Sequence, residues 1–325
     1  MTHNNGIKKK LYLHIGLHKT GTTSIQLFMH KNATQILDDY GVCYLPIPSD
    51  DIVPYQHRFL DKLMISNDEE FISLFEKSLN NADTILISSE CFLEKSEYAE
   101  QLAKLKHLFD ETHVIIYLRR QDEWIESLYK QAIMYNHKIG FTIDEWLDKM
   151  LFEGFLYYNA NFLETLNRWS SIFGKENITL RSFDKENLKD GNIVCDFCQI
   201  LSIPSQHFKN NQIHANAGIK NREIVEMYRL TNKIITLEQQ KELATKLICD
   251  ERESISILSP MQKKSIIKHY SSINETISIE YNAYEPLFSE HVELNNWHRF
   301  KGLSQENEKI INEYISSISN NKSNI

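Results

Sequence analysis

A short apolar stretch that runs directly into a glycine loop and then into a helical pattern constrains this chain more than any other feature. The segment LYLHIGLHKTGTTS, residues 11–24, begins with an expected strand over 11–15 and ends in hydroxyl side chains. Gly16 and Gly21 permit backbone conformations and close approaches that other residues resist. The first N–H groups of the following helix are unpaired and carry partial positive charge. The segment therefore predicts a phosphate or sulfate site between a strand and a helix.

The loop differs from the Walker A motif in the position of its lysine. In that motif a lysine follows the second glycine, whereas here Thr22 follows Gly21 and the lysine is Lys19. A lysine at this earlier position would reach a diphosphate-like group from a different side. The alternative interpretation is an ordinary turn whose polar side chains face solvent. We favour the anion site because a lysine and several hydroxyls are concentrated within a few residues, namely Lys19, Thr20, Thr22, Thr23 and Ser24.

Short β-branched stretches alternate with helical patterns through the first two thirds of the chain. This alternation predicts an α/β fold with a P-loop-like parallel β-sheet flanked by helices. Right-handed crossovers would place a ligand at the carboxyl ends of the strands. The strands are expected over 11–15, 84–88, 113–118 and 178–183. The helices are expected over 22–40, 68–81, 97–110, 122–136 and 160–173.

After about residue 210 the helical patterns continue with little strand signal. We therefore expect an α/β core over 8–210 and a helix-rich C-terminal region over 211–318, packed together as one domain. The C-terminal helices are expected over 220–233, 237–250, 259–274 and 304–318.

Charge and cysteine content limit the classes of function. The formal net charge of −8 argues against nucleic-acid binding but allows a local basic pocket. Five scattered cysteines do not suggest a disulfide framework and favour a reducing compartment, and the lone pair Cys195 and Cys198 is interpreted as two helical core residues. No stretch has the ~20 apolar residues of a membrane span, and no secretory signal is evident. A cytoplasmic location is expected, with peripheral membrane association left open.

A second candidate anion contact follows the third expected strand. Arg119 stands at the end of that strand, and Ser127 lies eight residues further on, in the expected helix. The planar guanidinium matches phosphate oxygens, and the serine adds a hydroxyl donor. Taken alone, the pair is equally compatible with a solvated arginine and an ordinary helical serine.

Together, the two motifs resemble those of the sulfotransferase family that uses 3′-phosphoadenosine 5′-phosphosulfate (PAPS). The 5′-phosphosulfate loop of the family is similar to residues 16–23, and its 3′-phosphate motif is similar to Arg119 followed by Ser127-Leu128-Tyr129. Many members carry Asn-Pro after that arginine, whereas this chain has Arg120-Gln121, as expected of a bacterial carbohydrate-type branch. The resemblance covers about residues 8–210.

The resemblance implies roles for both motifs. Lys19 would contact the bridging oxygen and stabilise charge on the departing phosphate. Arg119 and Ser127 would bind the 3′-phosphate, which distinguishes PAPS from ATP-like nucleotides. Because sulfonate carries one negative charge, no metal is expected, and the strand ends offer no magnesium-binding aspartate. The 5′-phosphate would be cradled by Thr20, Gly21, Thr22 and Thr23.

Transfer to a hydroxyl or an amine needs a group that takes the proton of the acceptor. Glu90 follows the second expected strand and is the first candidate, since related sulfotransferases often carry the base in this loop. His18, inside the glycine loop, and His57, in YQHRF, are the alternatives, and each of the three has a structural role as its competing interpretation. Candidates for the acceptor or adenine side, with core packing as the other interpretation, are His214, Asn216, Trp297 and Phe300.

The first hypothesis is therefore transfer of a sulfuryl group from PAPS to a carbohydrate acceptor, a glycan or a small sugar conjugate, with release of adenosine 3′,5′-bisphosphate. A P-loop-like nucleotide kinase is the second hypothesis, and magnesium dependence would separate the two. The third is a non-catalytic nucleotide-binding interaction protein, which would bind the bisphosphate without turnover.

Overall fold

The chain is described by a computed structural model over residues 8–49, 51, 53–66, 68–134, 139–153, 159–208, 221–249, 256–284, 286–292 and 297–322. It divides into two compact units that are interleaved along the sequence. The first unit comprises Met1–Arg120, Leu156–Ala215 and Tyr270–Ser289, and the second comprises Gln121–Phe155, Asn216–His269 and Glu290–Ile325. The division into 8–210 and 211–318 expected from the sequence stays a prediction.

The first unit is built on a parallel sheet of five strands in the order β2-β3-β1-β4-β5. The strands are β1 (Lys10–His14), β2 (Val42–Tyr44), β3 (Thr84–Ser88), β4 (Glu111–Leu118) and β5 (Ile178–Ser182). The predicted α/β fold with a parallel sheet flanked by helices is confirmed, and β2 is the strand that the sequence did not indicate. Because β1 lies between β3 and β4, the loops that follow these three strands leave the sheet side by side.

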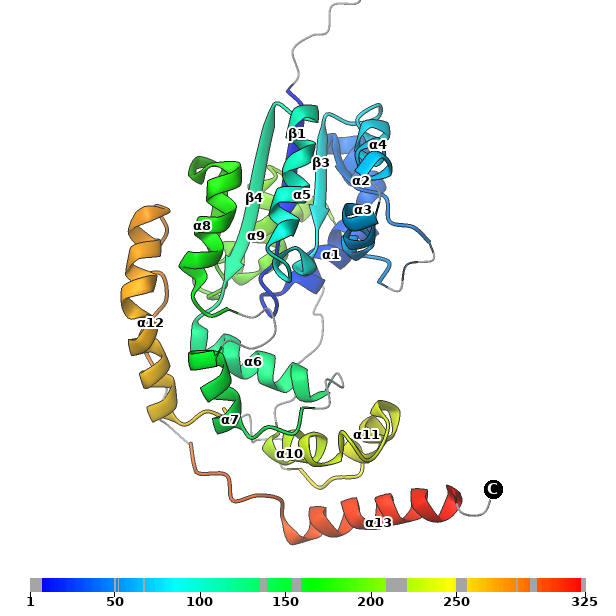
Figure 1. Cartoon of the computed structure of the whole chain (residues 1–325), viewed down its shortest axis with the longest axis vertical. Coiled ribbons are helices and arrows are strands. Elements are labelled where there is room, and N and C mark those ends of the chain that lie inside the picture. The colour runs from blue at the N-terminus through cyan, green and yellow to red at the C-terminus, as the bar shows by residue number, and fades with distance from the viewer. Residues whose placement is uncertain are drawn as a thin grey trace, which may run out of the picture. The chain divides into compact units, whose positions relative to one another are not determined.

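Helices cover both faces of this sheet (Figure 1). On one face, α1 packs with α9, and their apolar side chains form a core with the sheet that includes the fully buried Phe28, Leu86 and Ile115. On the other face, α5 packs with α8. The helices are α1 (Thr22–Lys31), α2 (Ala33–Tyr40), α3 (Leu60–Ser66), α4 (Asp68–Ser78), α5 (Glu97–Ala103), α8 (Phe162–Phe173) and α9 (Ile193–Ile200).

The helix expected over 22–40 is two helices. Asn32 leaves the helical conformation, with φ −109° and ψ 12°, and separates α1 from α2. Its side-chain amide donates to the carbonyl of Phe28 at 2.8 Å, and its backbone N–H donates to the same carbonyl at 3.1 Å. Short polar side chains compete with the helix backbone in this way, which a periodicity of apolar residues does not reveal.

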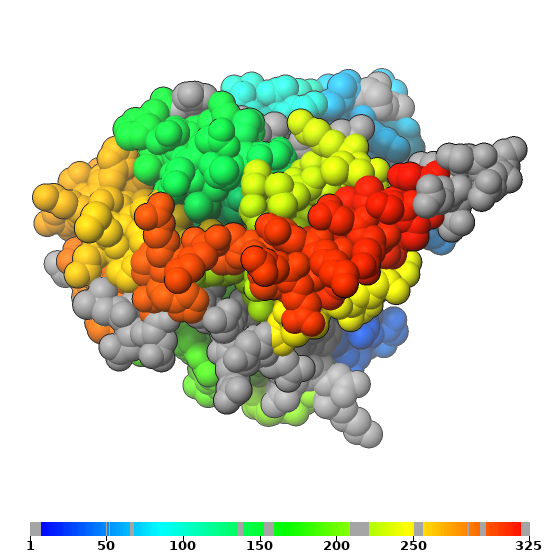
Figure 2. Space-filling model, turned by 90° about the horizontal axis from the view of Figure 1, so that it is seen from below, coloured from blue at the N-terminus to red at the C-terminus, as the bar shows by residue number. Residues whose placement is uncertain are grey.

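The second unit is helical in its described residues. It contains α6 (Gln121–Met134), α7 (Ile143–Asp148), α10 (Arg222–Thr231), α11 (Leu237–Ala244), α13 (Gln305–Lys322) and the part of α12 (Pro260–Glu280) up to His269. Figure 2 shows α13 in red against the yellow segments of α10 and α11. Asn307 on α13 donates to Glu223 on α10 at 2.5 Å, and Tyr314 donates to Glu242 on α11 at 2.7 Å. Among the described residues, no helix has the length and apolarity needed to cross a membrane.

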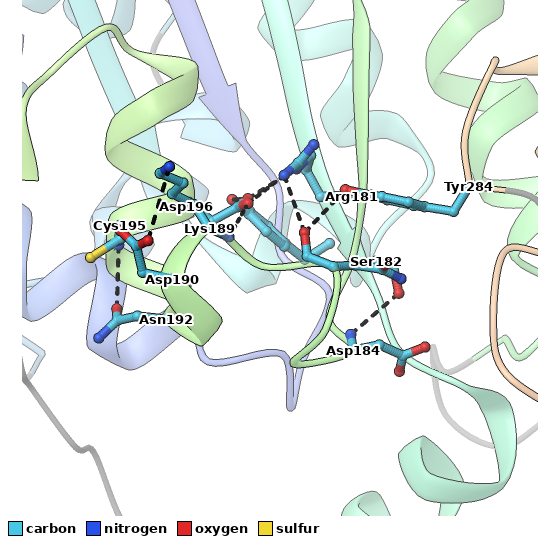
Figure 3. A network of polar contacts seen from close by, with 11 residues as sticks. Arg181, Ser182, Asp184, Lys189, Asp190, Asn192, Cys195, Asp196 and Tyr284 are labelled. Atoms are coloured by element: carbon cyan, nitrogen blue, oxygen red, sulfur yellow. Dashed lines mark hydrogen bonds and ion pairs between the residues drawn. The ribbon is translucent and has the colours of Figure 1, made fainter. Parts of the chain in front are cut away.

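A buried ion pair fixes α9 against β5 in the first unit (Figure 3). Asp196 is fully buried and accepts from the Nε of Arg181 at 2.9 Å and from the Tyr117 hydroxyl at 2.7 Å. The backbone N–H of Lys189 donates to the same carboxylate at 3.0 Å. The Arg181 guanidinium also lies over the ring of Tyr284, 5.6 Å from its centroid. Each carboxylate oxygen therefore has partners that offset its desolvation.

Removing this carboxylate should destabilise the fold. Asp196→Ala would leave the Arg181 guanidinium, the Tyr117 hydroxyl and the Lys189 N–H without their acceptor, which should lower the free energy of unfolding by about 3 kcal/mol. Urea denaturation followed by circular dichroism measures the change. The matched control is Asp38→Ala, which removes an exposed carboxylate on α2 and should stay within about 0.5 kcal/mol of wild type. Equal effects of the two substitutions would contradict this role of Asp196.

Candidate functional site

The loop between β1 and α1 has a backbone that few sequences can adopt. Gly16 has a φ of 100°, Gly21 has a φ of 75°, and Lys19 itself has a φ of 65°. A β-carbon on Gly16 would lie 3.4 Å from the Cα of Glu90, and one on Gly21 would lie 3.0 Å from the Cε2 of Phe183. Glycine is therefore favoured at both ends of the loop by its positive φ, and at Gly21 also by close packing. Left-handed Lys19 marks backbone strain of the kind that collects at functional sites.

The loop is tied to β4 and leads directly into α1. The N–H of Leu17 donates to the carbonyl of Tyr117 at 3.3 Å, and the N–H of Tyr117 donates to the carbonyl of Gly16 at 3.0 Å. Gly21 precedes the first residue of α1, and the first turn of this helix contains no acidic residue. The positive end of the helix dipole therefore acts on the loop without a compensating carboxylate in that turn.

The hydroxyl side chains of the loop have different roles. Thr20 and Thr22 are buried, Thr23 is half-buried, and Ser24 is 7% exposed. The Thr20 hydroxyl donates to the carbonyl of Leu17 at 2.6 Å, so its proton holds the loop together. We therefore expect Thr20 to serve an anion through its backbone N–H.

Two cationic side chains meet at this loop. The Nη1 of Arg119, just after β4, donates to the backbone carbonyl of Lys19 at 3.4 Å, and its guanidinium lies 5.7 Å from the ring centroid of Phe183. Burial lowers the pKa of Lys19, and the charge of Arg119 lowers it further, while Glu90 acts in the opposite direction. Among the described residues, Lys19 has no ion pair within 4.0 Å. A half-buried lysine beside an arginine and a helix N-terminus is a site whose charge an anion would balance.

Glu90 and His18 are brought together at the same edge of the sheet. Glu90 begins the short 3₁₀ helix η2 (Glu90–Leu93) after β3, and its Oε2 lies 3.0 Å from the Nδ1 of His18. The His18 ring is buried, and its Nε2 lies 4.0 Å from the Oε1 of Glu94. Two of the three candidate bases therefore form one contact, in which either can orient the other. Glu94 was not among the predicted residues, and no sequence motif indicated it.

The third candidate, His57, is held by backbone groups on both ring nitrogens. Its Nδ1 accepts from the N–H of Ser88 at 3.0 Å, and its Nε2 donates to the carbonyl of Leu45 at 2.8 Å. The ring is fully buried, and this burial lowers the pKa of His57 to about 4. These contacts fit a neutral imidazole that ties the loop after β2 to the end of β3, and they favour the structural interpretation of His57.

A buried polar network lies at the end of β1 and was not evident from the sequence. The Nδ1 of His14 lies 2.7 Å from the hydroxyl of Ser88, and Gln26 on α1 donates to the same hydroxyl at 3.2 Å. His14 is fully buried, and this burial lowers its pKa to about 3. The network joins β1, β3 and α1 next to the glycine loop. Only the paired strands and the helix packing bring these three residues together.

The second predicted phosphate contact, Ser127, is half-buried on α6 and belongs to the second unit. Its pairing with Arg119 around one phosphate stays a prediction. His214 and Asn216 lie outside the described residues. Among the described residues, no three His, Cys, Asp or Glu side chains are grouped so that they could hold a metal ion.

Comparisons with known proteins give two similarities. No protein-family model matches the chain. An uncharacterized protein of Archaeoglobus fulgidus is 26% identical over 204 residues, which are 61% of this chain and 53% of that protein. The chain thus spans about half the length of this curated relative. The crystal structure of a sulfotransferase from Alicyclobacillus acidocaldarius superposes with a TM-score of 0.42 at 14% identity, covering 65% of this chain and 87% of that one. Membership of the PAPS-dependent family stays the prediction made from the two motifs.

The buried His57 should make stability depend on pH. The pKa of this histidine is about 4 in the folded chain against an ordinary 6.5, so between these values the unfolded chain binds a proton that the folded chain does not. The free energy of unfolding should therefore fall as pH falls from 6.5 toward 4, by about 1.4 kcal/mol per pH unit for this group. Urea denaturation at several pH values in this range measures the slope.

His57→Gln should reduce that slope by about one proton. Wild-type protein denatured under the same conditions is the reference. An unchanged slope in His57→Gln would show that His57 is not buried as a neutral ring.

Proposed function

We propose that this protein is a sulfotransferase that moves a sulfuryl group from PAPS to a hydroxyl or an amine. The observation that carries the proposal is the meeting of Lys19, Arg119 and Glu90 around a glycine loop at the start of α1. The backbone N–H groups of the loop and of the start of α1 would bind the 5′-phosphosulfate. The planar guanidinium of Arg119 would bind a further phosphate through paired hydrogen bonds. Thr22, Thr23 and Ser24 would add backbone or hydroxyl donors to the 5′-phosphate, and Ser127 would add a hydroxyl to the 3′-phosphate.

The proposed reaction is an in-line transfer. The bond between sulfur and the bridging oxygen breaks, a new bond forms between sulfur and the acceptor oxygen or nitrogen, and the acceptor's proton passes to a base of the protein. Negative charge builds on the bridging oxygen as adenosine 3′,5′-bisphosphate leaves. Lys19 would stabilise that charge more in the transition state than before it, which is what accelerates a reaction.

Glu90 is our preferred base, with His18 as its partner. A carboxylate 3.0 Å from an imidazole can take a proton directly or orient the ring that takes it. His57 is less suited because both of its ring nitrogens already bond to the backbone. The acceptor class, a carbohydrate in a glycan or a small conjugate, follows from the family resemblance, as does the expectation that no metal takes part.

The arginine should recognise the 3′-phosphate specifically. Arg119→Ala should weaken adenosine 3′,5′-bisphosphate binding about 10- to 100-fold, the range expected for hydrogen bonds to a charged group, and should leave 5′-AMP binding nearly unchanged. Lys19→Ala should weaken both ligands. Isothermal titration calorimetry, without and then with magnesium, measures these affinities, and the exposed Lys104→Ala serves as the charge-matched control.

Three outcomes would oppose the proposal. Preference for ATP with magnesium over metal-free bisphosphate would favour the nucleotide kinase. If Arg119→Ala lowered the affinities for 5′-AMP and for the bisphosphate by the same factor, this arginine would not be the group that binds the 3′-phosphate. Normal bisphosphate binding with no transfer to any acceptor would favour a non-catalytic nucleotide-binding protein.

The base can be assigned by comparing two substitutions. Glu90→Gln should reduce kcat by about 10²- to 10⁴-fold, because it removes the proton acceptor while keeping the side-chain shape. His18→Asn should have the smaller effect if the ring only orients Glu90. Both variants should still bind the bisphosphate, and Glu100→Gln, an exposed carboxylate on α5, should leave kcat unchanged. The reverse order of the two effects would assign the base to His18.

A further inference from the structure

We propose that Glu94 is a positioning residue of the candidate site, where it holds the His18 ring against Glu90. The inference deepens the proposed function by adding a third side chain to the pair that would take the acceptor's proton, and this role rests on the proposed function. All three residues belong to the first unit. His18 lies in the glycine loop, Glu90 begins the short helix η2, and Glu94 directly follows that helix.

The His18 ring lies between two carboxylates. Its Nδ1 is 3.0 Å from the Oε2 of Glu90, and its Nε2 is 4.0 Å from the Oε1 of Glu94. The ring is only 9% exposed, so these carboxylates act on it in a setting with little water. A flipped ring would place carbon atoms at both positions, and carbon offers neither carboxylate an N–H. The two carboxylates together therefore select one orientation of the ring.

The spacing of the two carboxylates is set by the backbone of η2. The Ser89 hydroxyl accepts from the N–H of Cys91 at 3.3 Å, and the N–H of Glu94 donates to the carbonyl of Cys91 at 2.9 Å. The N–H of Ser89 also donates to the carbonyl of His14 at 3.0 Å, which ties the start of η2 to the end of β1. Both ends of η2 are thus hydrogen-bonded, so Glu90 and Glu94 are held at a fixed separation.

The Glu94 carboxylate faces the candidate site. Among the described residues, the His18 ring is the basic group that lies within 4.0 Å of this carboxylate. The adjacent Lys95 instead lies over the ring of Tyr98, 5.4 Å from its centroid. The Glu94 side chain is 19% exposed, so water screens its charge only in part. Its charge therefore acts on the imidazole.

A further carboxyl group, that of Asp61 on α3, interacts electrostatically with Glu94. Burial and the charge of Glu94 raise the pKa of Asp61 to about 7, while Arg58 and Lys95 act in the opposite direction. Below pH 7 Asp61 is therefore mostly neutral and adds little negative charge beside Glu94. In this range Glu90 and Glu94 are the two carboxylates that face the His18 ring.

This arrangement assigns a separate task to each side chain. Two carboxylates favour the protonated ring, because each can accept one of its N–H groups. The Nδ1–H would hold the Oε2 of Glu90, which leaves the Oε1 of Glu90 to take the proton of the acceptor. The ring keeps both of its own protons during this step. Glu94 would act through His18 without touching the acceptor, so its loss should change the ring and the rate of transfer but not nucleotide binding.

The first test follows the His18 ring by nitrogen-15 nuclear magnetic resonance in the ligand-free protein, with its signals assigned by their loss in His18→Asn. In Glu94→Gln the pH at which the ring is half-protonated should fall by about 1 unit, because the amide no longer stabilises the added charge. Glu94→Asp keeps the charge and should show a smaller fall. Glu100→Gln, an exposed carboxylate on α5, is the matched control and should show none. An unchanged titration in Glu94→Gln would overturn the proposal.

The second test measures release of adenosine 3′,5′-bisphosphate from PAPS with water as the acceptor. Glu94→Gln should lower kcat about 10-fold, the rate equivalent of about 1 pH unit of lost charge stabilisation, and leave the KM for PAPS unchanged. A wild-type kcat in this variant would overturn the positioning role. A wild-type protein that binds the bisphosphate but never releases it from PAPS would contradict the proposed function, whereas the ring titration would still decide whether Glu94 holds His18.

Discussion

The position of β1 between β3 and β4 in a parallel sheet determines where Lys19, Glu90 and Arg119 lie. Parallel strands end on the same edge, so the glycine loop after β1 has the Glu90 turn on one side and Arg119 on the other. The loop also bonds directly to β4 through Leu17 and Tyr117. A change in strand order would separate the lysine, the arginine and the carboxylate, although each would keep its local structure.

At this edge of the sheet, burial affects the protonation of Lys19 as well as the neighbouring charges do. Lys19 is half-buried, lies next to Arg119 and is close to the N-terminus of α1, so its charged form is less favoured than in water. Its left-handed backbone conformation points to strain in the same place. A dianionic phosphate group would offset both the desolvation and the repulsion between the cations. A buried network of neutral groups lies next to the loop and is formed by His14, Ser88 and Gln26. Because burial lowers the pKa of His14, this network adds no further charge to the site.

Much of this site could be predicted because its information is local. Strand, glycine loop and helix follow one another in residues 11–24, and Glu90 and Arg119 directly follow strands whose apolar pattern is clear. Contacts between distant segments could not be predicted. The bonds of His57 to Leu45 and Ser88, and the attachment of Arg181 to Asp196, depend on the paths of loops that have no periodic signal.

The grouping of α6 was not evident from the sequence for the same reason. The helix after Arg120 is read naturally as part of the α/β alternation, yet α6 groups with α10 and α11 through tertiary packing. The strand β2 has only three residues and follows a helix ending at Gly41, too short for an alternating pattern to appear. The buried position of Arg222 beside Trp297 likewise depends on two segments far apart in the chain.

The protonation of Lys19 tests the central claim most directly. Nuclear magnetic resonance of the lysine side chains, with the Lys19 signal assigned by its loss in Lys19→Ala, follows this ammonium through a pH titration with and without adenosine 3′,5′-bisphosphate. The account predicts a pKa below the ordinary 10.5 in the free protein and a clear rise when the bisphosphate binds. A Lys19 that titrates identically in both samples, while calorimetry shows the ligand bound, would contradict an anion site at this loop.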